Sequence, residues 1–252
     1  MVEVRVLPTE QDVAREAAER FVNAGREAVA ERGRYAVALA GGNTPAPLYR
    51  LLGGPARRDA LPWEQVHFFW GDDRCVPSDH PDSNYGLAWR EWLSHLDIPP
   101  ANIHRPHCEE DPEDAAAAYE EELRAFFGEE PAFDLIFLGV GEDGHTASIF
   151  PSTPAVMESR RWVMVNHRLG DPMPRVTLTL PVLNAARRVV FLVTGAKKAV
   201  VVCRILLDPT LHRSALPAAR VRPWAGSVTW LLDEPAAALW QKMSASSHPQ
   251  GA

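Results

Sequence analysis

Cysteine and lysine are both scarce in this chain of 252 residues. Its 3 cysteines are widely spaced and form no Cys-x-x-Cys pair, so we expect free thiols in a reducing cytoplasm rather than a disulfide framework. They are Cys75, Cys108 and Cys203. Most of the positive charge is arginine, which makes the adjacent lysines 197 and 198 conspicuous.

Signals for a membrane or for nucleic acid are also lacking. The first six residues have neither the basic region nor the apolar core of a signal peptide, and no apolar run approaches the ~20 residues that span a bilayer. With 26 basic and 33 acidic residues, the net charge of −7 excludes a general affinity for nucleic acid or anionic membranes. We expect a cytoplasmic monomer or homodimer whose partner is a small molecule.

Two groups of hydrolase motifs are missing. The chain has no Gly-x-Ser-x-Gly elbow and no His-Glu-x-x-His, which argues against serine hydrolases and zinc proteases of those types. His104, His107 and Cys108 are close in sequence, but their span is rich in proline and lacks a fourth ligand. We therefore interpret this span as a structural loop and predict no metal.

Alternating strand and helix patterns predict the fold class. Short apolar runs indicate strands at 35–40, 66–70, 135–138, 163–165, 177–180, 189–194 and 228–232. Helical spacing of apolar residues indicates helices at 11–31, 47–52, 85–96, 111–127, 196–207 and 235–243. This alternation predicts a three-layer, Rossmann-like α/β fold with a mainly parallel sheet and helices on both faces. We expect a single domain over residues 1–243 and a disordered polar tail over 244–252.

A glycine-rich loop, Gly139-Val-Gly-Glu-Asp-Gly-His145, follows the predicted strand 135–138. Open α/β sheets place their chemistry at the carboxyl ends of strands, and the ordinary pKa of histidine suits proton transfer near neutral pH. Asp143 has two comparable interpretations: it orients the His145 ring, or it accepts a hydrogen bond from its own backbone in an Asx-turn. Taken alone, the loop fits an active site and an ordinary turn equally well.

Two other strand ends have features that suit a phosphate. Gly41-Gly42-Asn43-Thr44-Pro45 offers free backbone N–H groups at the start of a helix that Thr44 is expected to cap. Its alternative is an ordinary capped turn. Lys198 lies where the helix 196–207 begins, a position that the helix dipole disfavours for a cation, so a role in phosphate binding is favoured.

The strand 66–70 ends at Gly71-Asp72-Asp73-Arg74. Arg74 could hold an oxyanion through two parallel hydrogen bonds. It could equally pair with Asp72 or Asp73, and from these residues alone the salt bridge is the favoured interpretation.

Several blocks together carry a family resemblance. They are 41–45, 70–77, 82–85, 139–151, 175–180, 195–198, 216–218 and 230–233. They resemble the 6-phosphogluconolactonase family, with its Gly-Gly-Ser-Thr-Pro, Trp-Gly-Asp-Glu-Arg-x-Val-Pro and Gly-x-Gly-x-Asp-Gly-His-Thr-Ala-Ser motifs. Asn43 replaces the family's Ser and Asp73 its Glu, and both replacements keep hydrogen-bonding capacity.

The resemblance implies hydrolysis of 6-phospho-D-glucono-1,5-lactone to 6-phospho-D-gluconate in the oxidative pentose phosphate pathway, without metal or cofactor. It implies a fold like that of glucosamine-6-phosphate deaminases and, more distantly, ribose-5-phosphate isomerases. It also implies His145 as general base, with Arg74 and Lys198 at the phosphate. With the strand-end groups added, the predicted substrate contacts are Gly41, Gly42, Asn43, Thr44, Asp72, Arg74, Gly144, Arg175 and Lys198.

Three alternatives stay open. A deaminase or isomerase of the same fold is disfavoured, because the resemblance places Arg74 and Thr146-Ala-Ser where deaminases carry Asp-Glu-Tyr and Ile-Ala-Phe-Asn-Glu-Pro. A nicotinamide-dependent oxidoreductase would use residues 139–144 as Gly-x-Gly-x-x-Gly, but Pro151 and Pro154 leave no room for the long helix that this motif needs. A non-catalytic sugar-phosphate sensor would not need His145.

Dialysis against EDTA should leave kcat/KM for lactone hydrolysis unchanged, and His107→Ala should be nearly silent. A strained lactone is reactive enough to hydrolyse without a Lewis acid. Rates and metal content are measured in parallel. Stoichiometric zinc whose removal abolishes turnover, and whose return restores it, would overturn this expectation.

Overall fold

A computed structural model of the chain describes residues 2–207 and 215–247. Its main element is a seven-stranded sheet in the order β1-β10-β9-β6-β2-β3-β5, in which every neighbouring pair is parallel. The strands are β1 (Val2–Leu7), β2 (Tyr35–Leu39), β3 (Val66–Trp70), β5 (Ile103–His104), β6 (Leu135–Leu138), β9 (Arg188–Val193) and β10 (Ser227–Asp233). Because they are parallel, their carboxyl ends meet at one edge of the sheet.

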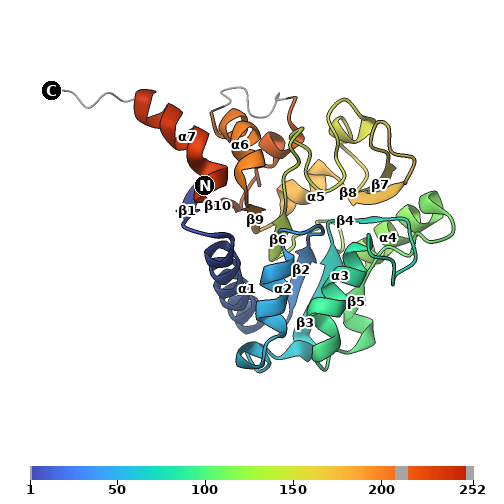
Figure 1. Cartoon of the computed structure of the whole chain (residues 1–252). Coiled ribbons are helices and arrows are strands. Elements are labelled where there is room, and N and C mark those ends of the chain that lie inside the picture. The colour runs from blue at the N-terminus through green and yellow to red at the C-terminus, as the bar shows by residue number, and fades with distance from the viewer. Residues whose placement is uncertain (1, 208–214, 248–252) are drawn as a thin grey trace.

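Helices cover both faces of this sheet (Figure 1). One face packs against α1 (Glu10–Arg32), α2 (Ala46–Gly53) and α3 (Asn84–Glu91). The other face packs against α4 (Pro112–Phe127), α5 (Leu180–Ala185), α6 (Ala199–Leu206) and α7 (Glu234–Ser247). Alternate strand residues enter opposite cores, as in β2, where Val37 faces the first group of helices and Ala38 the second. The predicted three-layer α/β class is confirmed.

A second, three-stranded antiparallel sheet lies against the α4 side of the molecule. Its order is β4-β8-β7, formed by β4 (Asp72–Arg74), β8 (Arg175–Leu178) and β7 (Val163–Asn166). No strand was predicted at residues 72–74, which pair with β8. Gly71 joins the two sheets, because its N–H donates to the Leu39 carbonyl of β2 at 3.0 Å and its carbonyl accepts the Leu178 N–H of β8 at 2.8 Å.

Several predicted boundaries are wrong. The strand predicted at 177–180 is Arg175–Leu178, and α5 begins at Leu180 with a proline in its first turn. The helix predicted at 196–207 opens with a 3-10 turn, and α6 proper starts at Ala199. The closing helix runs to Ser247, so the tail prediction fails for 244–247, while 248–252 lie outside the described residues.

Other boundaries follow from local chemistry. The Thr9 hydroxyl caps α1, whose end is set by Gly33 at a φ of 69°, a left-handed conformation that suits glycine. Asp111 caps α4 by accepting from the backbone N–H groups of Glu113 and Asp114. Within the described ranges, no helix is long and apolar enough to cross a membrane.

Trp92 is the centre of an aromatic cluster between the sheet and the helices α1 and α2. It is fully buried and contacts the rings of Phe21, Tyr49, Trp63 and Phe68. Trp92→Ala should lower the free energy of unfolding by about 3–5 kcal/mol, because the neighbouring rings cannot fill the cavity. The measurement is urea denaturation.

The matched control is Trp89→Ala in the same segment. Trp89 is 40% exposed, so its loss should change the free energy of unfolding by about 0.5 kcal/mol or less. A loss in Trp92→Ala as small as the one expected for Trp89→Ala would show that this cluster does not stabilise the fold.

Candidate functional site

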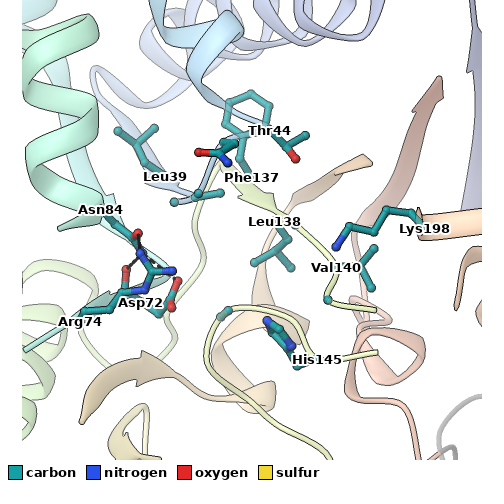
Figure 2. Close-up of a pocket in the computed structure, with 18 residues that line it drawn as sticks. Leu39, Thr44, Asp72, Arg74, Asn84, Phe137, Leu138, Val140, His145 and Lys198 are labelled. Carbon is teal, nitrogen blue, oxygen red and sulfur yellow. Dashed lines mark hydrogen bonds between the residues drawn. The ribbon is translucent and has the colours of Figure 1, made fainter. Parts of the chain in front are cut away.

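A cavity of about 340 Å³ opens at the carboxyl edge of the main sheet. Its wall combines the loops after β2, β3, β6 and β9 with residues of β4 and α3 (Figure 2). The lining residues are Leu39, Ala40, Gly41, Gly42, Asn43, Thr44, Gly71, Asp72, Arg74, Asn84, Phe137, Leu138, Gly139, Val140, Gly141, His145, Ala147 and Lys198. Four strand-end segments that are distant in sequence thus meet at one site.

His145 and Asp143 contact each other at the floor of this cavity. The Asp143 Oδ1 atom lies 2.5 Å from His145 Nδ1 and also accepts the His145 backbone N–H at 3.1 Å. The two interpretations of Asp143 are therefore compatible, since one oxygen serves the Asx-turn and the ring together. Gly141 allows this arrangement, because a Cβ there would lie 2.1 Å from His145 Nδ1.

The pKa values of both side chains are lowered from their ordinary values. Burial lowers the pKa of His145, although the charge and hydrogen bond of Asp143 and the charge of Asp72 oppose this shift. Burial acts to raise the pKa of Asp143, but the charge and hydrogen bonds of His145 outweigh it and the pKa is lowered. Near neutral pH the ring is neutral, and with Nδ1 held by Asp143 its Nε2 is the nitrogen left to accept a proton.

The backbone behind His145 is held rigidly. The buried Thr146 hydroxyl donates to the Gly139 carbonyl at 2.8 Å, and the Phe150 ring lies 4.8 Å from the His145 ring. Ala147 adopts a φ of 46°, a left-handed conformation that costs a non-glycine residue on the order of 1–3 kcal/mol. Gly144 has a φ of 86° and lies against Leu216 outside the cavity lining, so its predicted substrate contact is not supported by its position.

Residues 41–44 line the cavity as expected, but the predicted cap is wrong. The helix α2 begins at Ala46, and neither Thr44 nor Pro45 caps it with a side chain. The Ala46 N–H bonds the Asn43 carbonyl, so a turn precedes the helix and Thr44 faces the cavity instead (Figure 2). Gly42 has a φ of 83°, which explains why this turn needs a glycine.

Arg74 lines the cavity beside Asp72, and the favoured salt bridge is wrong. Its guanidinium donates to the Asp82 carbonyl at 2.8 Å and to Asn84 Oδ1 at 3.0 Å. In residues 2–207 and 215–247 it forms no ion pair with Asp72 or Asp73. Asn84 is a cavity residue that was not predicted, although it lies in the block 82–85 that carries part of the family resemblance.

Asp73 points away from the cavity and holds the start of α3. Its carboxylate accepts the backbone N–H groups of Arg74 at 2.8 Å, Asn84 at 2.6 Å and Tyr85 at 3.0 Å. Burial raises the pKa of Asp73 to about 6 although these hydrogen bonds oppose it. The carboxylate is therefore charged at neutral pH and gains a proton in mildly acidic solution.

Lys198 reaches the cavity from the turn after β9, whereas Lys197 is exposed and lies outside the lining (Figure 2). Gly195 starts this turn at a φ of 91°. Both carboxylate oxygens of Asp233, at the end of β10, accept the Gly195 N–H at 2.9 and 3.0 Å. Asp233 is thus a second residue that sequence reasoning missed.

Arg175 does not line the cavity. Its guanidinium pairs with Asp171 at 2.6 Å, donates to the Met173 carbonyl at 2.9 Å, and lies 5.5 Å from the centre of the Phe150 ring. The predicted substrate contact of Arg175 is therefore not supported by its position. Arg175 instead supports the Phe150 ring that packs on His145.

The three suspected metal ligands have separate surroundings. His104 contacts Glu122 at 2.6 Å and His67 at 3.1 Å, Cys108 is buried, and His107 lines a different surface pocket. Across the described ranges, no three histidine, cysteine or acidic side chains are placed to share a metal ion.

Comparison with known proteins shows the family of the chain. Residues 8–230 match the sequence family described as glucosamine-6-phosphate isomerases/6-phosphogluconolactonase. The chain belongs to this family. A 6-phosphogluconolactonase of Synechocystis sp. is 50% identical over 215 residues, which cover 83% of this chain and 86% of the relative.

Solved structures of the family have the same fold. A 6-phosphogluconolactonase from Thermotoga maritima superimposes with a TM-score of 0.80 at 32% identity, covering 92% of this chain and 100% of that one. A monomeric glucosamine-6-phosphate deaminase reaches a TM-score of 0.77 at 22% identity over 94% and 99% of the two chains, which shows the shared fold alone.

Asp143→Asn should lower the pKa of His145 further. The carboxylate opposes the burial of the ring by favouring the charged imidazolium, so its removal shifts the titration midpoint to lower pH. The measurement is an NMR titration of the His145 ring protons. Glu142→Gln, at the exposed neighbour, is the matched control and should leave the midpoint in place; an upward shift in Asp143→Asn would contradict the geometry.

Proposed function

We propose that this chain hydrolyses 6-phospho-D-glucono-1,5-lactone to 6-phospho-D-gluconate, with His145 as the general base. The observation that carries the proposal is the placement of His145, Arg74 and Lys198 around one cavity at the strand ends. Family membership supports the activity, as does the name 6-phosphogluconolactonase that relatives at 40–50% identity carry.

The reaction needs few groups. His145 Nε2 takes a proton from water as the water oxygen attacks C1 of the lactone. The bond between C1 and the ring oxygen then breaks, and the departing oxygen at C5 receives a proton from the imidazolium. Asp143 keeps the ring in one orientation and stabilises its charged form between the two transfers.

No covalent intermediate is invoked. The two hydroxyls nearest in sequence to His145 are those of Thr146 and Ser148, and both are buried. Thr146 donates to the Gly139 carbonyl at 2.8 Å and Ser148 donates to Asp72 Oδ2 at 2.6 Å. Both side chains lie outside the cavity lining. An activated ester such as a δ-lactone yields to water that is positioned beside a base.

In this proposal the phosphate is bound by Arg74, Lys198 and the backbone N–H groups of residues 41–44, all of which line the cavity. A chain of net charge −7 needs a local positive site to attract a dianion. In the described ranges neither cation is paired with a carboxylate, so both charges are available to the substrate. Asp72 faces the same cavity and favours the imidazolium form of His145.

A second function has less support. A deaminase of this fold would use the same sugar-phosphate cavity, but the deaminase likeness rests on 22% identity and the lactonase relatives on 40–50%. A sensor without catalysis would have no use for a histidine held by a carboxylate in the cavity. The direct test is to generate the lactone enzymatically and follow its disappearance with and without the protein.

His145→Ala should lower kcat by about 10²–10⁴ with little change in KM, because it removes the base but no substrate contact. The assay is steady-state lactone hydrolysis, corrected for the spontaneous rate. A variant that keeps more than about a third of the wild-type kcat would show that His145 is not the base.

Lys198→Ala should raise KM about tenfold to a hundredfold, the usual worth of a charged contact to phosphate. Gluconolactone without the phosphate should be a poor substrate for wild type and should be hardly affected by the change. Lys197→Ala is the matched control and should behave as wild type, because its side chain lies outside the cavity lining. An equal loss on both lactones would instead assign Lys198 to chemistry or folding.

A further inference from the structure

Asp72 and Arg74 should attract each other, yet they remain apart. They are two residues apart on β4, so their side chains leave the same face of the strand, and both line the cavity. The Asp72 carboxylate and the Arg74 guanidinium each form hydrogen bonds with neutral groups instead. Asp72 Oδ2 accepts from the Ser148 hydroxyl, while Arg74 donates to the Asp82 carbonyl and to the Asn84 side chain.

The Asn84 carboxamide hydrogen-bonds to both Arg74 and Asp72 (Figure 2). Its Oδ1 accepts from the Arg74 guanidinium at 3.0 Å. Its Nδ2 donates to the Asp72 carbonyl at 2.8 Å and to Asp72 Oδ1 at 3.3 Å. One neutral group therefore serves as acceptor for the cation and as donor for the anion.

Asn84 is itself tightly fixed. It is 2% exposed, and the buried Asp73 carboxylate accepts its backbone N–H at 2.6 Å. The loop after β2 closes over the amide, because a Cβ on Gly41 would lie 1.7 Å from Asn84 Oδ1. A rotation of the amide therefore requires movement of the loop after β2, and a shift of its backbone requires movement of β4.

We propose that Asn84 is a positioning residue that separates Arg74 from Asp72 and so keeps the Arg74 charge available to the substrate phosphate. The inference rests on the proposed function, since it assigns Arg74 to that phosphate. An amide alone among the standard side chains of this length presents both a fixed acceptor and a fixed donor without charge. A carboxylate here would neutralise Arg74 and repel Asp72, and a small apolar side chain would let the two charges collapse into an ion pair.

The test is the preference for phosphate, defined as kcat/KM for the phosphorylated lactone divided by kcat/KM for gluconolactone. Dividing the two rates cancels effects on the shared chemistry at His145. Asn84→Ala and Asn84→Asp should each lower this preference about tenfold, mainly through KM for the phosphorylated lactone. Arg74→Ala should lower it by a similar factor or more.

The double variant Asn84→Ala with Arg74→Ala decides the mechanism. If Asn84 acts through Arg74, the double variant has the preference of Arg74→Ala alone, because the effects are not additive. If the losses of the two single variants multiply in the double variant, the inference is overturned. It is also overturned if Asn84→Ala keeps the wild-type preference for phosphate. An unchanged preference in Arg74→Ala itself would instead remove Arg74 from the phosphate, which overturns the proposed binding site as well.

Ser83→Ala separates positioning from folding. Ser83 is buried next to Asn84 and caps α3 by accepting the Gly86 N–H at 2.9 Å. Its loss should lower Tm without changing the preference for phosphate. If Ser83→Ala lowers the preference as much as Asn84→Ala does, the effect is a general loosening of α3 and the inference fails.

Discussion

The parallel pairing of the seven-stranded sheet is the constraint on which the rest of the structure depends. Parallel strands bury both faces, which is why residues such as Val37 and Ala38 enter different cores, and they bring every carboxyl end to one edge. Loops that start at residues 40, 71, 139 and 194 then share a cavity. The edge also carries the tight turns at Gly42 and Gly195, where φ is positive.

The small antiparallel sheet adds charged side chains to the cavity that the large sheet forms. Its strand β4 places Asp72 and Arg74 at the cavity on one face. On the other face it places Asp73, which binds the backbone at the start of α3. The alternation of side chains along the strand thus separates the residues that line the cavity from the one that holds α3. Its partner strand β8 begins with Arg175, which supports the ring behind His145.

Most of the large sheet and the positions of the strand-end loops could be predicted from the sequence. Periodicity found most of its helices and strands, and the position of residues 41–44, 74, 145 and 198 at strand ends predicted their convergence, because parallel topology leaves little choice. It failed where a contact between distant segments decides the outcome. Residues 72–74 become a strand only when β8 is available, and Arg175 is drawn to Asp171 rather than to the cavity. Similarly, the Arg74 salt bridge is the obvious pairing until Asn84, ten residues further on, occupies the space between.

The hydrogen bonds from Gly195 to Asp233 link two segments that leave the ribosome at different times in the nascent chain. The turn that presents Lys198 is held by a residue 38 positions later, at the end of the last strand added to the sheet. During synthesis, this turn therefore lacks its anchor until Asp233 has been added to the chain. A product truncated before the end of β10 cannot form either hydrogen bond at Gly195.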